Sequence, residues 1–196
     1  MGTVFVDISM SLDGFIARPN DDVDPLHEWL YGLKGFREPH GMEGGTTDPD
    51  SEIIDEAMNR SGAVIVGRRM YELADGWGDN PPFHKPVFVL THQAREPLVK
   101  EGGTTFAFVT DGAESALAQA RAVAGDRDIS IGGGARTVQQ YLGAGLVDEM
   151  QIHIVPVLLG AGIRLFDGIG PGLVKLETTR VIQSPAVTHL RFRVLR

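Results

Sequence analysis

The chain has no cysteine among its 196 residues. Disulfide bonds and thiolate-bound zinc or iron–sulfur clusters are therefore excluded. A zinc-dependent nucleobase deaminase that holds its metal with a Pro-Cys-x-x-Cys motif is excluded for the same reason. The remaining residues predict no metal site.

Basic residues are also few, because 18 Lys and Arg stand against 26 Asp and Glu, for a formal net charge of −8. Such a surface argues against nucleic acid or an anionic membrane as a partner. No apolar run approaches the roughly 18 residues of a membrane-spanning helix. A strand-like pattern begins at Val4, with no signal-peptide pattern before it. We expect a cytoplasmic protein with one domain over residues 1–196.

Strand-like and helix-like segments alternate through most of the chain. Asp48-Pro49 predicts a helix start, with an N-cap acceptor before proline, and the pattern continues to Arg60. A short helix is predicted over residues 25–33, whereas residues 34–47 show no periodicity. Three strand-like segments end the chain, at residues 147–158, 174–183 and 187–195. This order predicts an α/β fold with a central, mostly parallel sheet, antiparallel C-terminal strands and flanking helices.

The most informative segment is residues 128–141, in which a short apolar strand enters Gly132-Gly133-Gly134 and a helix begins. Without side chains, the glycines let a ligand approach the backbone, and the free N–H groups of a helix start favour an anion. The alternative is that the glycines only form a tight turn between a strand and a helix. The segment is thus a candidate phosphate site.

A second helix start follows the buried strand at residues 63–66 and carries Arg68 and Arg69 in its first turn. Cations are unfavourable there unless an anion offsets them, and the 2′-phosphate of NADPH is such an anion. The alternative is a solvated basic turn in which the arginines pair with Glu72 or nearby acids. Together with the glycine segment, the pair favours a phosphorylated dinucleotide.

These segments, in this order, resemble the dihydrofolate reductase superfamily. The more specific likeness is to the riboflavin-biosynthesis reductase (RibD C-terminal domain) family and its stand-alone members. The resemblance spans nearly the whole chain and is carried by Ser11–Ala17, Gly67–Arg69, Val87–His92, Ile131–Gly134 and Pro156–Phe166.

The resemblance implies a dihydrofolate reductase-like fold, a homodimer, and NADPH lying across the carboxyl edge of the sheet. It also implies a cis peptide between Gly132 and Gly133. The residues it assigns to the 2′-phosphate region are Gly67, Arg68, Arg69, Met70, Thr91 and His92. Those assigned to the pyrophosphate are Gly132, Gly133, Gly134, Ala135, Arg136 and Thr137, and those assigned to the nicotinamide are Ile16 and Ala17. Ser9, on the first strand, is a further candidate cofactor-binding residue.

Three residues are candidates for the chemistry. Asp7 shares one face of the first strand with Ser9, because side chains alternate along a strand. We interpret Asp7 as a substrate-orienting or proton-relaying group with His153 as its partner, since an acid in an apolar strand is costly without one. His153 is alternatively an ordinary hydrogen-bonded core histidine. Asp13 is the third candidate catalytic residue, and it ranks below the other two because Asp13-Gly14 is typical of a turn.

These observations predict an NADPH-dependent oxidoreductase that reduces a small heterocycle. The substrate classes that the resemblance implies are those of 5-amino-6-(5-phosphoribosylamino)uracil reductase and of dihydrofolate reductase. The chain departs from both: Leu26 occupies the position of the folate-reductase acid, three residues before Trp29, and Phe15 replaces a basic residue usual in riboflavin reductases. A non-catalytic NADP-binding or sensor protein that retains the fold is the alternative.

Overall fold

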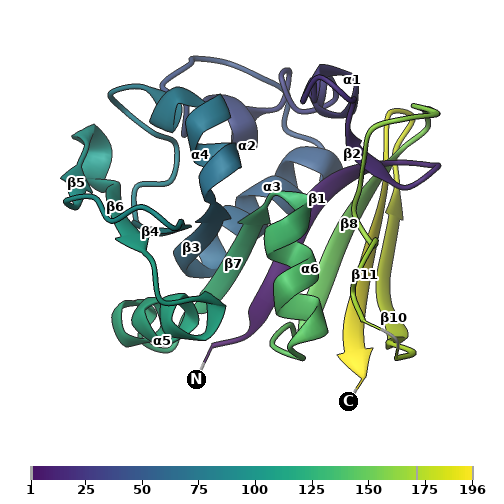
Figure 1. Ribbon diagram of the computed structural model, residues 1–196. Coiled ribbons are helices and arrows are strands. Elements are labelled where there is room, and N and C mark those ends of the chain that lie inside the picture. Colours follow the sequence, from purple (N-terminus) through teal and green to yellow (C-terminus); the bar gives the residue numbers. More distant parts are fainter. Residues whose placement is uncertain (1, 171, 196) are drawn as a thin grey trace.

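The computed structural model describes residues 2–170 and 172–195, and these form a nine-stranded sheet with the order β10-β11-β8-β1-β7-β3-β4-β6-β5 (Figure 1). The strands are β1 (Val4–Ser11), β2 (Phe15–Ala17), β3 (Ser61–Gly67), β4 (Pro86–Leu90), β5 (Leu98–Val99), β6 (Thr105–Val109), β7 (Asp128–Gly133), β8 (Glu149–Val155), β9 (Ile163–Arg164), β10 (Lys175–Gln183) and β11 (Thr188–Leu195). The helices are α1 (Asp24–His27), α2 (Lys34–Arg37), α3 (Pro49–Arg60), α4 (Arg68–Leu73), α5 (Ala113–Ala124) and α6 (Ala135–Gly143), with 3₁₀ turns at Asp75–Trp77 and Glu101–Gly103.

The predicted sheet is confirmed. The strands from β8 to β6 run parallel to one another. Strands β10 and β11 are antiparallel and join the sheet at β8, while the short β5 is antiparallel at the other edge. Parallel neighbours require crossover segments, which explains why strands and helices alternate until the C-terminal strands.

The helix predicted from Asp48 to Arg60 is also confirmed. The Asp48 carboxylate accepts a hydrogen bond of 2.9 Å from the Ser51 backbone N–H, and Pro49 occupies the first helical position. A side-chain acceptor at this position satisfies an N–H group that has no partner within the helix.

The helix predicted over residues 25–33 is wrong in length. Helix α1 ends at His27, and the chain continues through tight turns. The Leu26 carbonyl accepts the Trp29 indole N–H at 3.0 Å, so a side chain takes an acceptor that a continuing helix would use. Residues 34–47, which lack periodicity, nevertheless contain the short α2.

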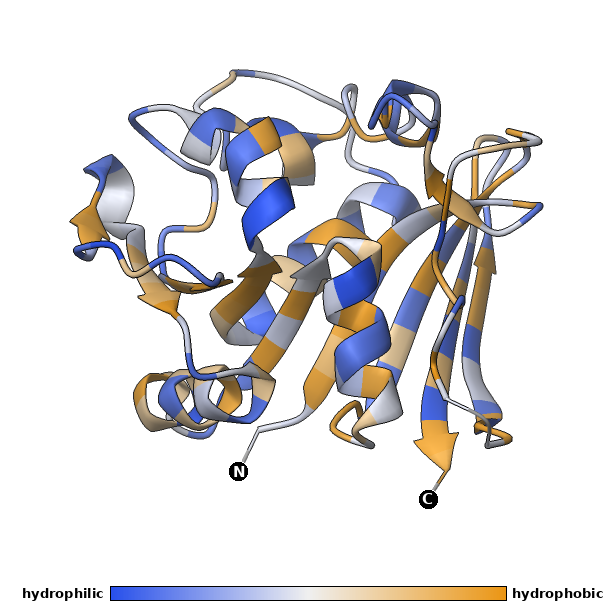
Figure 2. Cartoon of the chain, viewed as in Figure 1, coloured by the Kyte–Doolittle hydropathy of each residue, from blue (hydrophilic) through white to orange (hydrophobic). Residues whose placement is uncertain are grey.

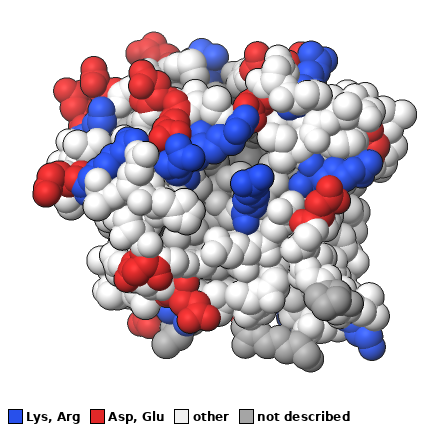
Figure 3. Space-filling view, in the orientation of Figure 1, with Lys and Arg blue, Asp and Glu red and all other residues white. Residues whose placement is uncertain are grey.

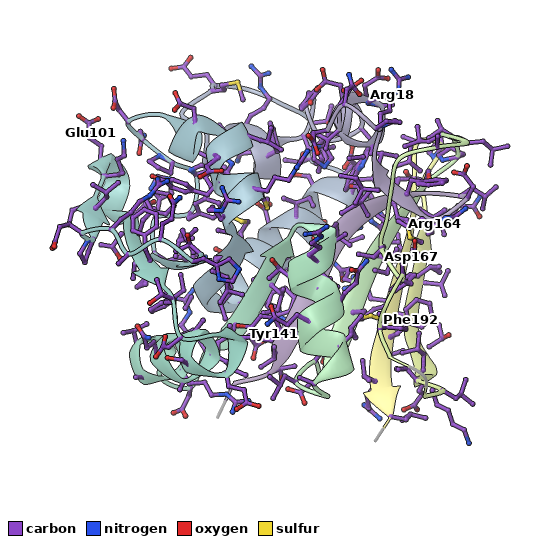
Figure 4. All side chains as sticks on the ribbon, viewed as in Figure 1. Arg18, Glu101, Tyr141, Arg164, Asp167 and Phe192 are labelled. Atoms are coloured by element: carbon purple, nitrogen blue, oxygen red, sulfur yellow. The ribbon has the colours of Figure 1, made fainter. Side chains whose placement is uncertain are left out.

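One face of the sheet carries the main apolar core. Figure 1 shows α5 and α6 in front of the sheet and α3 behind it. Figure 2 colours the central strands mainly as hydrophobic and much of the outward surface of α6 as hydrophilic. Tyr141 of α6 is fully buried, and its hydroxyl donates to the Ala113 carbonyl at 2.7 Å, while Phe192 of β11 packs against the same core (Figure 4). Burial of the apolar side chains of this core supplies most of the driving force for folding.

Helix α3 lies on the opposite face and is anchored there by charge. Arg60 at its end forms ion pairs of 2.8 Å with Asp128 and with Glu149, and its guanidinium lies 4.0 Å from the centre of the Phe5 ring.

Among the described residues, no helix combines the length and the apolar character that crossing a bilayer requires.

Candidate functional site

The parallel sheet brings the predicted cofactor residues to one edge. Strands β1, β7, β3 and β4 are neighbours and point the same way, so their carboxyl ends meet. In open α/β sheets, ligands bind outside this edge. The residues placed there are Ser9 near the end of β1; Gly67 at the end of β3, with Arg68, Arg69 and Met70 after it; Thr91 and His92 after β4; and Gly132, Gly133, Gly134, Ala135, Arg136 and Thr137 from β7 into α6.

The two helix starts lie against each other. A Cβ atom on Gly67 would stand 2.5 Å from the Thr137 hydroxyl oxygen, so only glycine lets the end of β3 approach α6 this closely. The sulfur atom of Met70 would stand 3.5 Å from a Cβ atom on Gly133. The start of α4 and the start of α6 therefore belong to one surface.

The start of α6 has the properties of a phosphate cradle. Within the described chain, no side chain caps this helix at Gly134. A Cβ atom on Gly134 would meet nothing within 4 Å, so open space adjoins the backbone there. Free N–H groups beside open space suit an anion, and the pyrophosphate of a dinucleotide fits this arrangement.

The cis peptide lies one residue later than expected, between Gly133 and Gly134 rather than between Gly132 and Gly133. The reason is that β7 continues through Gly133, whose register partner is Val66. Gly132 remains in the strand, where a Cβ atom would meet the Val66 side chain at 3.4 Å. The junction between strand and helix therefore begins one residue further along.

The two arginines of α4 are exposed and already hold acids. Arg68 pairs with Glu72 at 2.7 Å, and Arg69 pairs with Asp21 in the segment after β2. These contacts are those of the alternative interpretation, a basic turn paired with nearby acids. Figure 3 nevertheless shows Lys and Arg side chains in a band across this face, at the level of the start of α4. Their contact with a 2′-phosphate stays a prediction.

The other predicted cofactor residues differ in burial and in their hydrogen bonds. Ile16 and Ala17 lie in β2, which follows β1 in the sequence, pairs with β9 and is buried. Thr91 is buried and its hydroxyl accepts from the Gln93 N–H at 3.0 Å, whereas His92 is exposed. The Ser9 hydroxyl accepts from the Trp29 indole N–H at 3.2 Å.

Asp13 fixes a loop. Its carboxylate accepts from the Ser11 hydroxyl at 2.6 Å and from the backbone N–H groups of Leu159 and Gly160. The hydrogen bond from Ser11, followed by that from Gly160, lowers the pKa of Asp13 to about 2. An acid that stays ionised at neutral pH is a poor proton donor. The geometry thus agrees with Asp13 as a turn residue.

Asp7 and His153 are in contact, as the sequence predicts. The Asp7 carboxylate and the Nε2 atom of His153 are 2.9 Å apart across the neighbouring strands β1 and β8. The second oxygen of Asp7 accepts from the Gln151 amide at 2.9 Å. The side chain of Asp7 is 18% exposed while that of His153 is 2% exposed. The pair therefore has one end accessible to a small molecule and one end sealed.

Sequence reasoning missed the groups behind this pair. The Nδ1 atoms of His153 and His189 are 2.6 Å apart, and the Nε2 atom of His189 lies 3.0 Å from the Asp50 carboxylate. The Trp29 ring covers both imidazoles, with centroid distances of 5.1 and 5.3 Å. The available signal was the alternation of polar residues in β11, but the register that pairs His189 with His153 is not visible in the sequence.

Burial controls the charge of two histidines near this cluster. Burial lowers the pKa of His189, and the hydrogen bond to Asp50 opposes that shift. Burial also lowers the pKa of His27 on α1. Both rings are therefore favoured in their neutral forms.

Comparison with known proteins assigns the fold and the family. YyaP of Bacillus subtilis (strain 168), an uncharacterised protein, is 26% identical over 195 residues, which cover 94% of this chain and 91% of that protein. A putative riboflavin biosynthesis protein from Shewanella sp. PV-4 superposes with a TM-score of 0.74 and 23% identity over 99% of both chains. Dihydrofolate reductase from Enterococcus faecalis, solved with NADP(H), superposes with a TM-score of 0.56 and 14% identity over 98% of this chain and 96% of that one.

These likenesses confirm the predicted dihydrofolate reductase-like fold. The family of the RibD C-terminal domain matches residues 2–190, which is nearly the whole chain. The chain belongs to the RibD C-terminal domain family.

Proposed function

We propose that this protein is an NADPH-dependent reductase of a small nitrogen heterocycle of the pyrimidine or pterin class. The observation that carries the proposal is the placement of Asp7, paired with His153 of β8, on β1, which is the direct neighbour of the strand β7 that ends in the glycine junction. A group able to give a proton thus adjoins an edge suited to a phosphorylated dinucleotide. Membership of a family of reductase domains supports the same function.

The chain's own residues suit the cofactor. The start of α6 would hold the pyrophosphate through its backbone N–H groups, and Arg68 and Arg69 would contact the 2′-phosphate. Bound NADPH supplies a hydride to an electron-poor carbon of the substrate. The buried β2 segment would close over the nicotinamide end and limit the access of water.

Asp7 would orient the substrate and provide the proton. When a C=N bond is reduced, the carbon gains a hydrogen with its electron pair, the nitrogen gains a proton, and the π bond breaks. A carboxyl group is suited to contact an N–C–N edge of a heterocycle and to donate that proton. Asp7 ends the step as a carboxylate, and the Gln151 amide donates a hydrogen bond to that charge.

Two features argue against the best-known substrates of the fold. Leu26, at the position of the folate-reductase acid, is fully buried among Val155 and Val187. Phe15 is buried as well, with the Arg164 guanidinium 4.3 Å from its ring centre. A substrate with a smaller or differently substituted ring than dihydrofolate is therefore the better match.

The test is an absorbance assay of NADPH oxidation with pterins, flavins and pyrimidines as candidate acceptors. Oxidation with at least one heterocycle, and its loss in Asp7→Asn with NADPH binding retained, would support the proposal. Binding of NADPH without oxidation across the whole panel would instead favour the sensor alternative.

A further inference from the structure

A chain of four side chains runs behind the candidate site from one carboxylate to another. Asp7 on β1 contacts His153 on β8 at 2.9 Å, His153 contacts His189 on β11 at 2.6 Å, and His189 contacts Asp50 on α3 at 3.0 Å. The side chains of His153, His189 and Asp50 are between 2% and 10% exposed. Water therefore has little access to these contacts.

The four hydrogen-bonded side chains need one proton more than their two imidazoles carry when neutral. Each of the three contacts requires one hydrogen, because two lone pairs facing each other repel. Two neutral imidazoles bring two hydrogens, one each. A third hydrogen must therefore reside on one of the imidazoles or on one of the carboxyl groups.

The Asp7 end of the chain has a fixed polarity. Arg191 donates twice to the Gln151 amide oxygen, at 2.8 and 2.6 Å. Since arginine only donates, the amide carbonyl of Gln151 must face Arg191, and its NH₂ group must face the Oδ2 atom of Asp7. That oxygen is an acceptor, so a proton on Asp7 belongs on Oδ1, which faces His153.

The Asp50 end has the opposite polarity. Asp50 lies in the first turn of the 12-residue helix α3, where the helix dipole favours a negative charge. A charged Asp50 accepts from the Nε2–H of His189, which leaves the Nδ1 atom of His189 to accept from His153. Burial lowers the pKa of His189, so this ring does not take a second proton readily. The third hydrogen is thereby directed to the contact between His153 and Asp7.

We propose that Asp50 and His189 are positioning residues that hold one transferable proton at the Asp7–His153 contact. Asp50 fixes the tautomer of His189, and His189 fixes that of His153, so the Nε2 atom of His153 faces Asp7 with the proton between them. The inference rests on the proposed function for its use, because that proton is the one that the reduced nitrogen receives. After the transfer, Asp7 is a carboxylate and His153 is a neutral imidazole, and no other bond changes within the chain.

Asp50→Asn tests the chain directly. An asparagine amide can donate to the Nε2 atom of His189, so every contact can then be satisfied with the hydrogens of two neutral imidazoles and the amide. Both tautomers would invert, with His153 protonated on Nε2 and carrying a lone pair on Nδ1. Nitrogen NMR of histidine-labelled protein, without cofactor or substrate, distinguishes the two nitrogens of each ring.

In the unmodified protein we expect Nδ1–H on His153 and Nε2–H on His189, and in Asp50→Asn we expect the inverted pattern. The matched control is Asp48→Asn at the N-cap of the same helix. Asparagine is an equally good cap, and Asp48 does not contact Asp7, His153, His189 or Asp50. The control should keep the original tautomers. Unchanged tautomers in Asp50→Asn, or Nδ1–H on His189 in the unmodified protein, would overturn the inference.

Kinetics give a second measurement once a substrate is found. Asp50→Asn should lower kcat by about tenfold or more and shift the acid side of the pH profile, with the KM for NADPH unchanged. Asp48→Asn should keep both. An unchanged kcat in Asp50→Asn would contradict the role in proton supply. The NMR experiment needs no substrate. It can therefore disprove the proposed tautomers without disproving the reductase function, and the absence of reductase activity would leave the tautomers testable.

Discussion

The two faces of strands β1, β8 and β11 differ in what they bury. Towards α5 and α6 the strands present apolar side chains such as Val6, Ile152 and Phe192. Towards α3 the same strands present Asp7, His153 and other polar groups, most of them in hydrogen bonds to one another. The same period-two backbone therefore supports a stabilising core on one face and a charged network on the other.

The two faces place different demands on their side chains. An apolar face requires only complementary shapes, whereas each buried polar group must find a partner or it destabilises the folded state. A connected polar cluster next to the carboxyl edge of the sheet is therefore an unusual use of buried surface. Substitutions on either face test this division of roles, because each should change stability or catalysis but not both.

Asp7→Asn should have the largest effect on activity. An amide has nearly the same shape as the carboxyl group but does not deliver its proton, so we expect kcat to fall by about 10²- to 10⁴-fold. Titration of NADPH into the variant checks that cofactor binding is retained. A variant that reduces the substrate at the original rate would remove Asp7 from the chemistry.

Ile152→Ala on the other face of β8 should affect stability rather than catalysis. Ile152 is 2% exposed, and truncation of such a side chain lowers the free energy of unfolding by about 2–5 kcal/mol. Urea denaturation measures the loss, and the activity per folded molecule should not change. If turnover fell as it does in Asp7→Asn, the separation between the two faces would not hold.

Gly134→Ala tests whether the start of α6, the helix that covers the apolar face, binds the cofactor. The backbone at Gly134 has φ −76°, which any residue adopts, and its Cβ atom would enter open space. The protein should fold normally while NADPH binding weakens by about 1–3 kcal/mol, because the methyl group crowds the phosphates. Titration calorimetry measures the effect, and Gly32→Ala, also in open space, is the matched control. Equal affinities for all three proteins would place the cofactor elsewhere.

The double variant Arg68→Ala/Arg69→Ala sharpens the choice of cofactor. Both side chains are exposed and paired with acids, so each phosphate contact is partly offset by the loss of an ion pair. We expect NADPH to bind about 1.5 kcal/mol more weakly and NADH to be almost unaffected. An equal loss for both nucleotides would show that these arginines do not recognise the 2′-phosphate.

The smallest expected effect is a pH dependence that belongs to the polar face. Burial lowers the pKa of His189 below its ordinary value of 6.5, so the unfolded chain binds more protons than the folded one in this range. The free energy of unfolding should therefore fall as the pH falls below about 6.5, by less than about 1.4 kcal/mol per pH unit for one group. The pKa of His27 is also lowered by burial, so His27 changes the free energy of unfolding in the same direction.

Urea denaturation at several pH values measures this slope. His189→Gln should flatten it, whereas Ile152→Val on the apolar face should leave it unchanged. A slope that is the same in all three proteins would mean that His189 does not contribute.

Local patterns were sufficient to predict the sheet, helix α3 and the contact between Asp7 and His153. Alternation placed Asp7 on the polar face, and the burial cost of an acid required a partner. The resemblance supplied the cofactor edge. The junction was misplaced by one residue because the end of β7 depends on its pairing with β3, which no local pattern encodes.

His189 and Asp50 were beyond reach for a related reason. They lie 139 residues apart in the sequence and meet only because β11 pairs with β8 and α3 packs across that face. Likewise, α1 is short because the Trp29 indole takes the Leu26 carbonyl, a choice that helix propensity does not reveal. Tertiary contacts settled each of these features.

Titration calorimetry with NADPH tests the central claim most directly, since every proposed role depends on that coenzyme meeting the carboxyl edge. The account predicts one binding site per chain and a weaker affinity for NADH. An absence of heat with both NADPH and NADP would contradict it.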